Sequence, residues 1–301
     1  MRNASVYLLL MFVMMIWGLN VVAVKFLVEH MPPVQMQGLR ISIAAVTALL
    51  IVWLLKEFKR IDKKMLFMIA GAALFGQTAH HSLLAVGLTD TTAANGSLIL
   101  GLIPLTTAVL AVIFLGDPLT KFRLFGILLG FSGVTFIILS PEEGVGTVSR
   151  GDLLIFLSMI SQAVSFILIK KASSTLSPRL ITAVMLVFGA ASMLVISYLF
   201  EPGAAVPQPP LVWMVFFSSA VIATSIGHLL FNAAIQKIGP GPSALFNNFV
   251  PFFALLGSYF LLGENIYSHQ IFGFILIVTG VLFGTGYIES QVLKRKNAQR
   301  A

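Results

Sequence analysis

Two histidines lie inside long apolar stretches of the chain, and imidazole is the side chain that titrates near neutral pH. His81 and His228 are 147 residues apart, which is also the period of a sequence repeat. Such a histidine either gates a pathway, binds a carboxylate when protonated, or simply bonds a neighbouring helix. We take both residues as candidates for substrate binding and gating, with the structural role as the alternative.

Other polar side chains occur at helical spacing in the same kind of apolar stretch. The additional candidates for substrate binding are Trp17, Asn20, Gln77, Gln162, Ser165, Asn232 and Asn248. A polar group in hydrocarbon needs a partner, so these side chains are expected to face the interior of a helical bundle or a wet cavity. The alternative is packing, because serines bond helix carbonyls and asparagines join neighbouring helices.

Two basic residues, Lys25 and Arg40, also fall inside apolar stretches and are candidates for gating or charge recognition. Lys25 is near a predicted helix end, from which its side chain can reach the headgroups. Arg40 lies about 10 Å from such an end at 1.5 Å per residue. It either pairs with Glu29 or Asp90 or attracts an anionic group.

The composition is that of a membrane protein. Of 301 residues, 58% are hydrophobic and 10% are charged, whereas a soluble domain carries about 25% charged residues. The mean hydropathy is +0.98 and cysteine is absent. These values exclude a soluble enzyme, a disordered chain and a disulfide scaffold. Nucleic acid is not an expected partner despite the net charge of +8, because the charges are too sparse to form a basic surface.

Charge-poor runs long enough to span a bilayer recur along the chain, since a spanning helix needs about 20 apolar residues. Ten are present, at 5–28, 34–55, 65–88, 93–115, 122–140, 152–170, 179–200, 211–236, 243–262 and 269–288. We therefore predict an all-α integral membrane protein with ten transmembrane helices and the lipid bilayer as its surroundings.

The basic residues predict the orientation. Sixteen of the 19 fall on one side of the ten segments, the exceptions being Arg150, Lys25 and Arg40. Because Lys and Arg concentrate in cytoplasmic loops, both termini are predicted to be cytoplasmic. The membrane is expected to be a plasma membrane or a bacterial inner membrane.

A shift of 147 residues aligns two parts of the chain without a gap. The equivalent pairs are Pro104 and Pro251, Gly116 and Gly263, Asp117 and Glu264, Gly126 and Gly273, and Gly133 and Gly280. Five spans per copy is an odd number, so the copies are predicted to be two inverted five-helix repeats. Their bounds are residues 1–145 and 146–290, followed by a basic cytoplasmic tail at 291–301. The two prolines are expected to kink their helices.

Glycines spaced four residues apart occur at Gly126 and Gly130 in the fifth predicted span, and at Gly280 and Gly284 in the tenth. Such spacing lets helix backbones approach closely. The sequence leaves two interpretations open, which are packing within one chain and a homodimer through these two helices.

The chain resembles the EamA family of the drug/metabolite transporter superfamily. The resemblance rests on "IWGLNVVAVK" in the first span, "GLR" at 38–40, and the paired "LGD" and "LGE" at the ends of the fourth and ninth spans. It implies a ten-helix carrier that works by alternating access, with a cavity lined by helices 1, 3, 4, 6, 8 and 9. Asp117 stands where the family usually has Glu.

No Asp or Glu lies centrally in any predicted span, which argues against a carrier that exchanges cationic drugs for protons. We predict a secondary transporter for a small neutral, zwitterionic or anionic metabolite, an amino acid above all, working as an exporter. The alternatives are a multidrug efflux carrier, a channel or a membrane-embedded enzyme. No enzyme activity, cofactor or metal site is expected, because the sequence has no phosphate-binding loop and no H-E-x-x-H motif.

Overall fold

The computed structural model describes residues 4–139, 149–172, 176–203, 208–238, 243 and 246–291. Within these ranges all regular elements are helical, and none is a strand. The α-helices are α1 (Ala4–Val28), α2 (Pro33–Leu54), α3 (Lys63–Ala73), α4 (His80–Thr89), α5 (Ala93–Leu100), α6 (Ile103–Leu115), α7 (Lys121–Ile138), α8 (Arg150–Ala172), α9 (Pro178–Phe200), α10 (Pro210–Ser218), α11 (Gly227–Ile238), α13 (Phe249–Gly257) and α14 (Ser268–Gly284).

Among the described residues, seven helices are long and apolar enough to cross a membrane, and two shorter apolar helices, Phe249–Leu262 and Ser268–Gly284, accompany them. This agrees with the predicted class, an all-helical membrane protein. The arrangement of ten spans in two repeats stays a prediction. The boundary between the predicted repeats, at residues 145 and 146, lies outside the described residues. The same holds for the predicted tail, apart from its first residue, 291.

Three π-helical segments interrupt the α-helices in the described ranges: η1 (Leu74–Ala79), η3 (Ser219–Ile226) and η4 (Ser258–Leu262). The first two join α3 to α4 and α10 to α11, and they overlap when the chain is shifted by 147 residues. Hydroxyl groups of α8 bind carbonyls of η1 and of the end of α3, with Ser161 Oγ 2.9 Å from Phe75 O and Ser165 Oγ 2.8 Å from Ala72 O. Because π-helical turns are rare and frequent at functional sites, η1 and η3 mark positions of interest.

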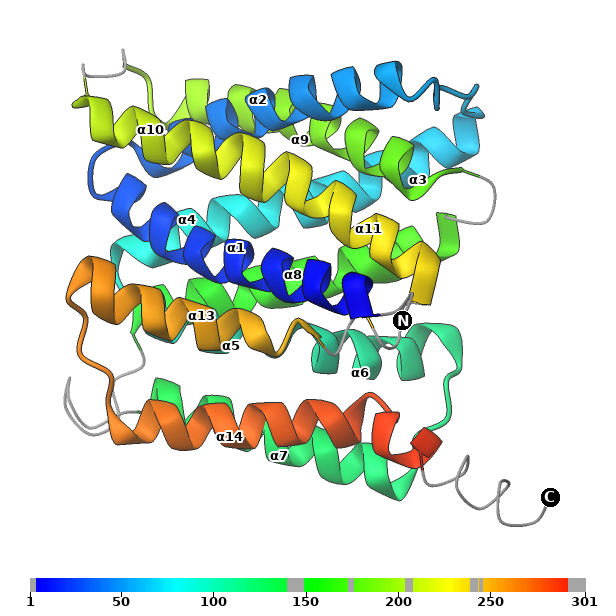
Figure 1. Ribbon diagram of the computed structural model, residues 1–301, viewed down its shortest axis with the longest axis vertical. Coiled ribbons are helices and arrows are strands. Elements are labelled where there is room, and N and C mark those ends of the chain that lie inside the picture. Colours follow the sequence, from blue (N-terminus) through cyan, green and yellow to red (C-terminus); the bar gives the residue numbers. More distant parts are fainter. Residues whose placement is uncertain are drawn as a thin grey trace.

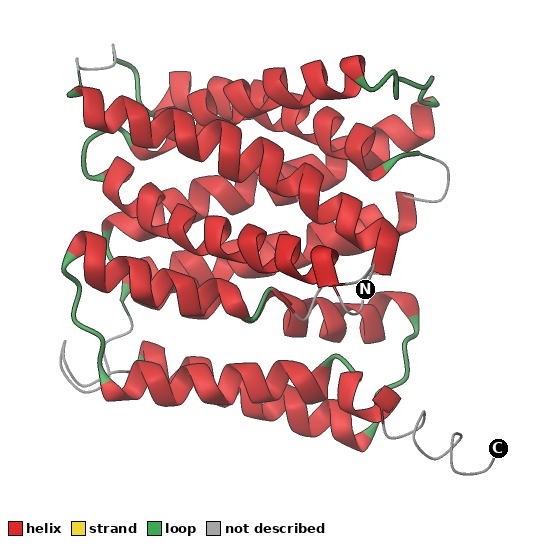
Figure 2. Cartoon of the chain, in the orientation of Figure 1, coloured by secondary structure: helices red, strands yellow, loops and turns green. Residues whose placement is uncertain are grey.

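The helices lie side by side in layers (Figure 1). The antiparallel pair α2 and α9 forms one edge, the pair α7 and α14 forms the opposite edge, and α1, α4, α5, α8 and α13 lie between. The start of α1 and the end of α14 lie at the same end of the bundle. The connections that the structure describes are short, as the green segments of Figure 2 show.

Glycines bring α7 and α14 into backbone contact. A Cβ on Gly280 would lie 2.5 Å from Gly130 N, and one on Gly126 would lie 2.2 Å from Gly284 N. Packing within one chain therefore accounts for both glycine pairs. A homodimer through the remaining faces of these helices stays a prediction.

Large apolar side chains cover the outside of the bundle, among them Phe67 and Tyr198, which are 82% and 79% exposed. The interior is filled by smaller aliphatic residues of α1, α4, α5 and α8, such as Leu27, Leu88 and Ile155. A soluble monomer rarely exposes so much continuous apolar surface, so this exterior is suited to lipid.

The two prolines lie close to the start of a helical segment. Pro104 is the second residue of α6, after an interruption at residues 101–102, and Pro251 is the third residue of α13. The N–H group that proline lacks would have no intrahelical partner at these positions. That the two prolines kink their helices stays a prediction.

Candidate functional site

Arg40 of α2 is fully buried, and its guanidinium group binds four neighbouring side chains. Its Nε donates to Gln37 Oε1 at 2.7 Å, on the same helix. Its Nη1 donates to Ser219 Oγ at 3.1 Å and to Thr224 Oγ1 at 2.7 Å, both on η3. Its Nη2 lies 3.3 Å from His81 Nδ1 on α4. We name Asn20, Gln37, Arg40, His81, Ser219 and Thr224 the Arg40 cluster, since Ser219 Oγ also donates to Asn20 Oδ1.

The acids proposed as partners of Arg40 bind elsewhere, so that interpretation was wrong. Glu29 pairs with Lys25 at 3.3 Å, one helical turn away on α1. Asp90 Oδ2 lies 3.8 Å from Nη1 of Arg150, the first residue of α8. No ion pair among the described residues includes Arg40, and the side chains bonded to it are an amide, two hydroxyls and an imidazole.

His81 accepts a hydrogen bond from Arg40, because a guanidinium group can only donate. This geometry assigns a lone pair to His81 Nδ1 and hence a neutral imidazole with its proton on Nε2. The ring of His80 meets that of His81 edge-on at 4.8 Å. His80 itself is bound to Ser158 of α8 through Nδ1, at 2.8 Å from the hydroxyl.

His228 of α11 connects to the same network through Thr224. Its Nδ1 lies 2.7 Å from Thr224 O, and the Thr224 hydroxyl accepts from Arg40. The Trp17 ring packs against His228 at 4.9 Å, and its Nε1 donates to Ala223 O at 3.1 Å. The two repeat-related histidines are thus linked through one arginine, and their action as gates stays a prediction.

Two further predicted residues carry a buried polar atom without a hydrogen-bond partner among the described residues, Gln77 Oε1 and Asn248 Oδ1. Gln162 is half-buried beside η1, where a Cβ on Gly76 would lie 3.6 Å from its Oε1. Ser165 is fully buried and bound to a helix carbonyl, so it packs α8 against α3. The Asn232 side chain lies outside the described part.

Three members of the Arg40 cluster, Gln37, Ser219 and Thr224, were not among the predicted site residues. Gln37 precedes Arg40 by three residues on α2, a spacing that places both on one helix face and could have indicated it. Ser219 is the first residue of the π-helical segment η3. The periodicity of a regular α-helix does not predict toward which neighbour a side chain in such a segment points.

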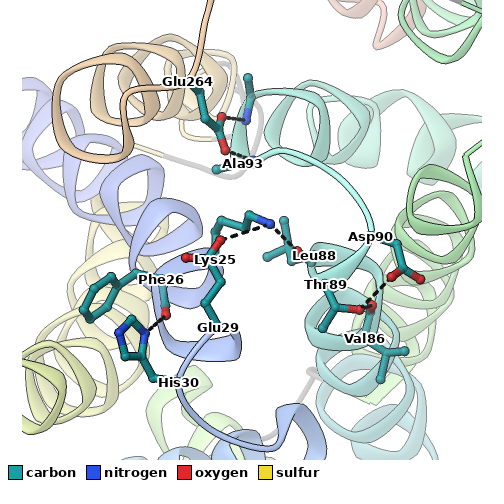
Figure 3. A network of polar contacts seen from close by, with 11 residues as sticks. Lys25, Phe26, Glu29, His30, Val86, Leu88, Thr89, Asp90, Ala93 and Glu264 are labelled. Carbon is teal, nitrogen blue, oxygen red and sulfur yellow. Dashed lines mark hydrogen bonds and ion pairs between the residues drawn. The ribbon is translucent and has the colours of Figure 1, made fainter. Parts of the chain in front are cut away.

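Lys25 lies at one end of the bundle within a second polar network (Figure 3). Its Nζ donates to Leu88 O at 3.0 Å, at the end of α4, and also binds Glu29. Nearby, Glu264 accepts from the backbone N–H groups of Ala93 and Ala94 at 2.8 and 3.0 Å. Lys25 is therefore bound to a helix end rather than extended toward headgroups.

The Glu264 carboxylate caps the start of α5, where unpaired N–H groups and the helix dipole favour an anion. Glu201, which follows α9, binds the start of α2 in the same way, with Oε2 2.7 Å from Gln35 N. In both places a carboxylate from residues 149–291 holds a helix from residues 4–139.

The geometry describes a helical membrane protein with a buried polar cluster between its two halves and no carboxylate in that cluster. This arrangement suits a transporter, and comparison with known proteins agrees. The EamA-like transporter family matches residues 4–139 and 149–285. The chain belongs to this family, as the resemblance predicted, and is a multi-pass membrane protein. Family membership favours a transporter over an enzyme.

The chain is also similar to individual proteins of this kind. It is 30% identical over 295 residues to the "Uncharacterized transporter YyaM" of Bacillus subtilis, covering 96% of both chains. It is 28% identical over 285 residues to the "Probable amino-acid metabolite efflux pump" of Salmonella typhimurium, covering 91% of this chain and 92% of that one. A crystal structure with a TM-score of 0.70 and 17% identity, covering 96% of this chain and 99% of the other, has the same fold.

Proposed function

We propose that this chain is a secondary carrier that exports an amino acid or a similar small metabolite by alternating access. It would reside in the cell membrane with both termini in the cytoplasm. Its ten spans would form two inverted repeats, residues 1–145 and 146–290, with the basic tail 291–301 in the cytoplasm. The family supports a transporter, and the name of the Salmonella relative supports this substrate class.

The observation that carries the proposal is the composition of the Arg40 cluster. Asn20, Arg40 and His81 come from the first half of the chain, and Ser219 and Thr224 come from the second. A movement of one half against the other would break and remake these contacts. Polar sites between two halves are where transporters of this construction hold their substrates.

The surroundings of the cluster also bear on the charge of the substrate. Histidine and arginine are its titratable side chains, and no described carboxylate contacts Arg40. A cationic drug would meet a like charge there, which disfavours multidrug efflux. A neutral, zwitterionic or anionic metabolite would not.

Counterflow in proteoliposomes tests the carrier. Vesicles containing the purified chain are preloaded with one unlabelled amino acid, and uptake of the same ¹⁴C-labelled amino acid is followed for each of the common amino acids. A carrier gives a transient accumulation above equilibrium, whereas a channel or an enzyme gives none. Absence of accumulation for every amino acid would overturn the proposal.

A further inference from the structure

We infer that Arg40 binds the carboxylate of the transported molecule, so that the carrier selects substrates bearing this group. The inference rests on the proposed function and names the chemical class of its substrate. It is carried by the contacts, the burial and the charge of Arg40, together with hydrogen-bond donors beside it that have no partner in the part of the chain that the structure describes.

No carboxylate among the described residues compensates the charge of Arg40. The guanidinium group is fully buried, and its acceptors are an amide, two hydroxyls and an imidazole, all neutral. A buried charge without a counter-ion is costly, and an arginine retained in a membrane interior is expected to serve a pathway or a ligand. An incoming carboxylate would supply the missing counter-ion.

Donors remain open beside this charge. A guanidinium group has five N–H groups, and Arg40 uses four in hydrogen bonds to described residues, leaving one on Nη2. Gln37 Nε2 is buried and has no hydrogen-bond partner among the described residues, while Gln37 Oε1 lies 2.7 Å from Arg40 Nε. Both side chains project from one face of α2, so one carboxylate can accept from an arginine and an amide donor.

The described titratable groups that contact Arg40 or its histidine neighbours are all basic. His81 contacts Arg40 directly, His80 contacts His81, and His228 connects through Thr224. An anion therefore finds no like charge here, whereas a carboxamide of the same shape gains no charge compensation.

Ser219 and Thr224 cover Nη1, and both belong to η3, the π-helical segment of the second half, whereas the open N–H group is on Nη2. A carboxylate carries a full negative charge and can accept two parallel N–H bonds from a guanidinium group, so it competes well against these two neutral hydroxyls. Trp17 and Asn20, which are half-buried, lie at the border of the cluster and would be met on the way in.

The first experiment varies the ligand and leaves the protein unchanged. For each amino acid that gives counterflow, inhibition of its uptake by the unlabelled amino acid is compared with inhibition by its carboxamide and by the amine lacking the carboxylate. We expect both analogues to inhibit at least about tenfold more weakly, the loss of one charge-assisted contact. Equal inhibition by acid and amide overturns the inference while leaving the carrier intact.

The second experiment varies the protein. Arg40→Gln is expected to abolish the preference for acid over amide, and Arg40→Lys to retain a part of it. Arg150→Gln is the matched control, because Arg150 is 77% exposed and pairs with Asp90. A preference that survives in Arg40→Gln overturns the inference. Size-exclusion chromatography identifies a misfolded variant, in which case the ligand series on the unchanged protein decides.

The outcomes separate the two proposals. Failure of counterflow for every amino acid overturns the proposed function and this inference together. Counterflow with equal inhibition by acid and amide overturns the inference alone. Counterflow with an acid preference that depends on Arg40 supports both.

Discussion

A methyl group added at Gly280 tests how closely α14 and α7 pack. A Cβ there would lie 2.5 Å from Gly130 N, 2.6 Å from Gly130 Cα and 2.7 Å from Gly126 O. Ordinary contact begins at 3.4 Å, so the shortfall is 3.4 minus 2.5, or 0.9 Å. All three atoms belong to the backbone, so no side-chain rotation relieves the overlap and the helices must separate.

The magnitude follows from two opposing terms. Overpacking of this kind costs about 1–3 kcal/mol. Replacing a helical glycine by alanine contributes about 0.5–1 kcal/mol in the other direction. Gly71 of α3 provides the control, because a Cβ there would meet no atom within 4 Å. The free energy of unfolding of Gly280→Ala should therefore fall below that of Gly71→Ala by about 1–3 kcal/mol, the overpacking cost alone.

The assay is equilibrium unfolding of both purified variants and the unchanged protein in the same detergent, with SDS as denaturant and helicity as signal. We expect Gly71→Ala to equal or exceed the unchanged protein and Gly280→Ala to be the less stable variant. Equal stability of the two variants would refute the close approach of these helices and, with it, the assignment of the glycine pairs to packing within one chain.

Two further substitutions address the polar networks. Glu264→Gln removes the charge that caps α5, so backbone hydrogen exchange at Ala93 and Ala94 should accelerate about fivefold or more, as loss of about 1 kcal/mol implies; unchanged exchange contradicts the cap. Ser219→Ala removes an acceptor of the buried guanidinium group and should lower the free energy of unfolding by about 1–3 kcal/mol. Ser258 is also buried, but its hydroxyl donates to Leu255 O three residues earlier in the chain. Ser258→Ala should therefore lower the free energy of unfolding by less than Ser219→Ala, and the reverse order would contradict the role given to Ser219.

Helix positions were predictable because the bilayer sets their length. The predicted span 34–55 is Pro33–Leu54 in the structure, and 179–200 is Pro178–Phe200. Apolar stretches of about 20 residues bounded by proline or charge leave little freedom in placing the ends. The same argument gives no information inside a span, where composition does not distinguish an α-turn from a π-turn.

The interior of the spans was therefore less predictable. The span predicted at 65–88 contains η1, where Phe75 O accepts a hydrogen bond from Ser161 of α8, a residue distant in the sequence. Ser165, a candidate for substrate binding, donates to Ala72 O of α3. Hydrogen bonds of this kind depend on which helices become neighbours, which a single sequence does not specify.

Of the two acids considered as partners of Arg40, one could have been excluded from the sequence alone. Lys25 and Glu29 are four residues apart on one helix, a spacing that favours an ion pair and could have removed Glu29 from the candidates. The ion pair between Asp90 and Arg150 depends on how α8 packs, so the structure was needed to exclude Asp90 as a partner of Arg40. The remaining alternative, attraction of an anionic group, is the one developed above.

The distribution of the Arg40 cluster along the chain has a consequence for biosynthesis. Ser219 and Thr224 follow Arg40 by 179 and 184 residues. At about 5–20 residues per second, a ribosome needs about 10–40 s to produce them after Arg40 has been made. Until the second half arrives, the partners that the structure gives Arg40 within the nascent chain are Gln37 and, once it has been made, His81. The buried charge therefore gains its two hydroxyl acceptors only late in synthesis.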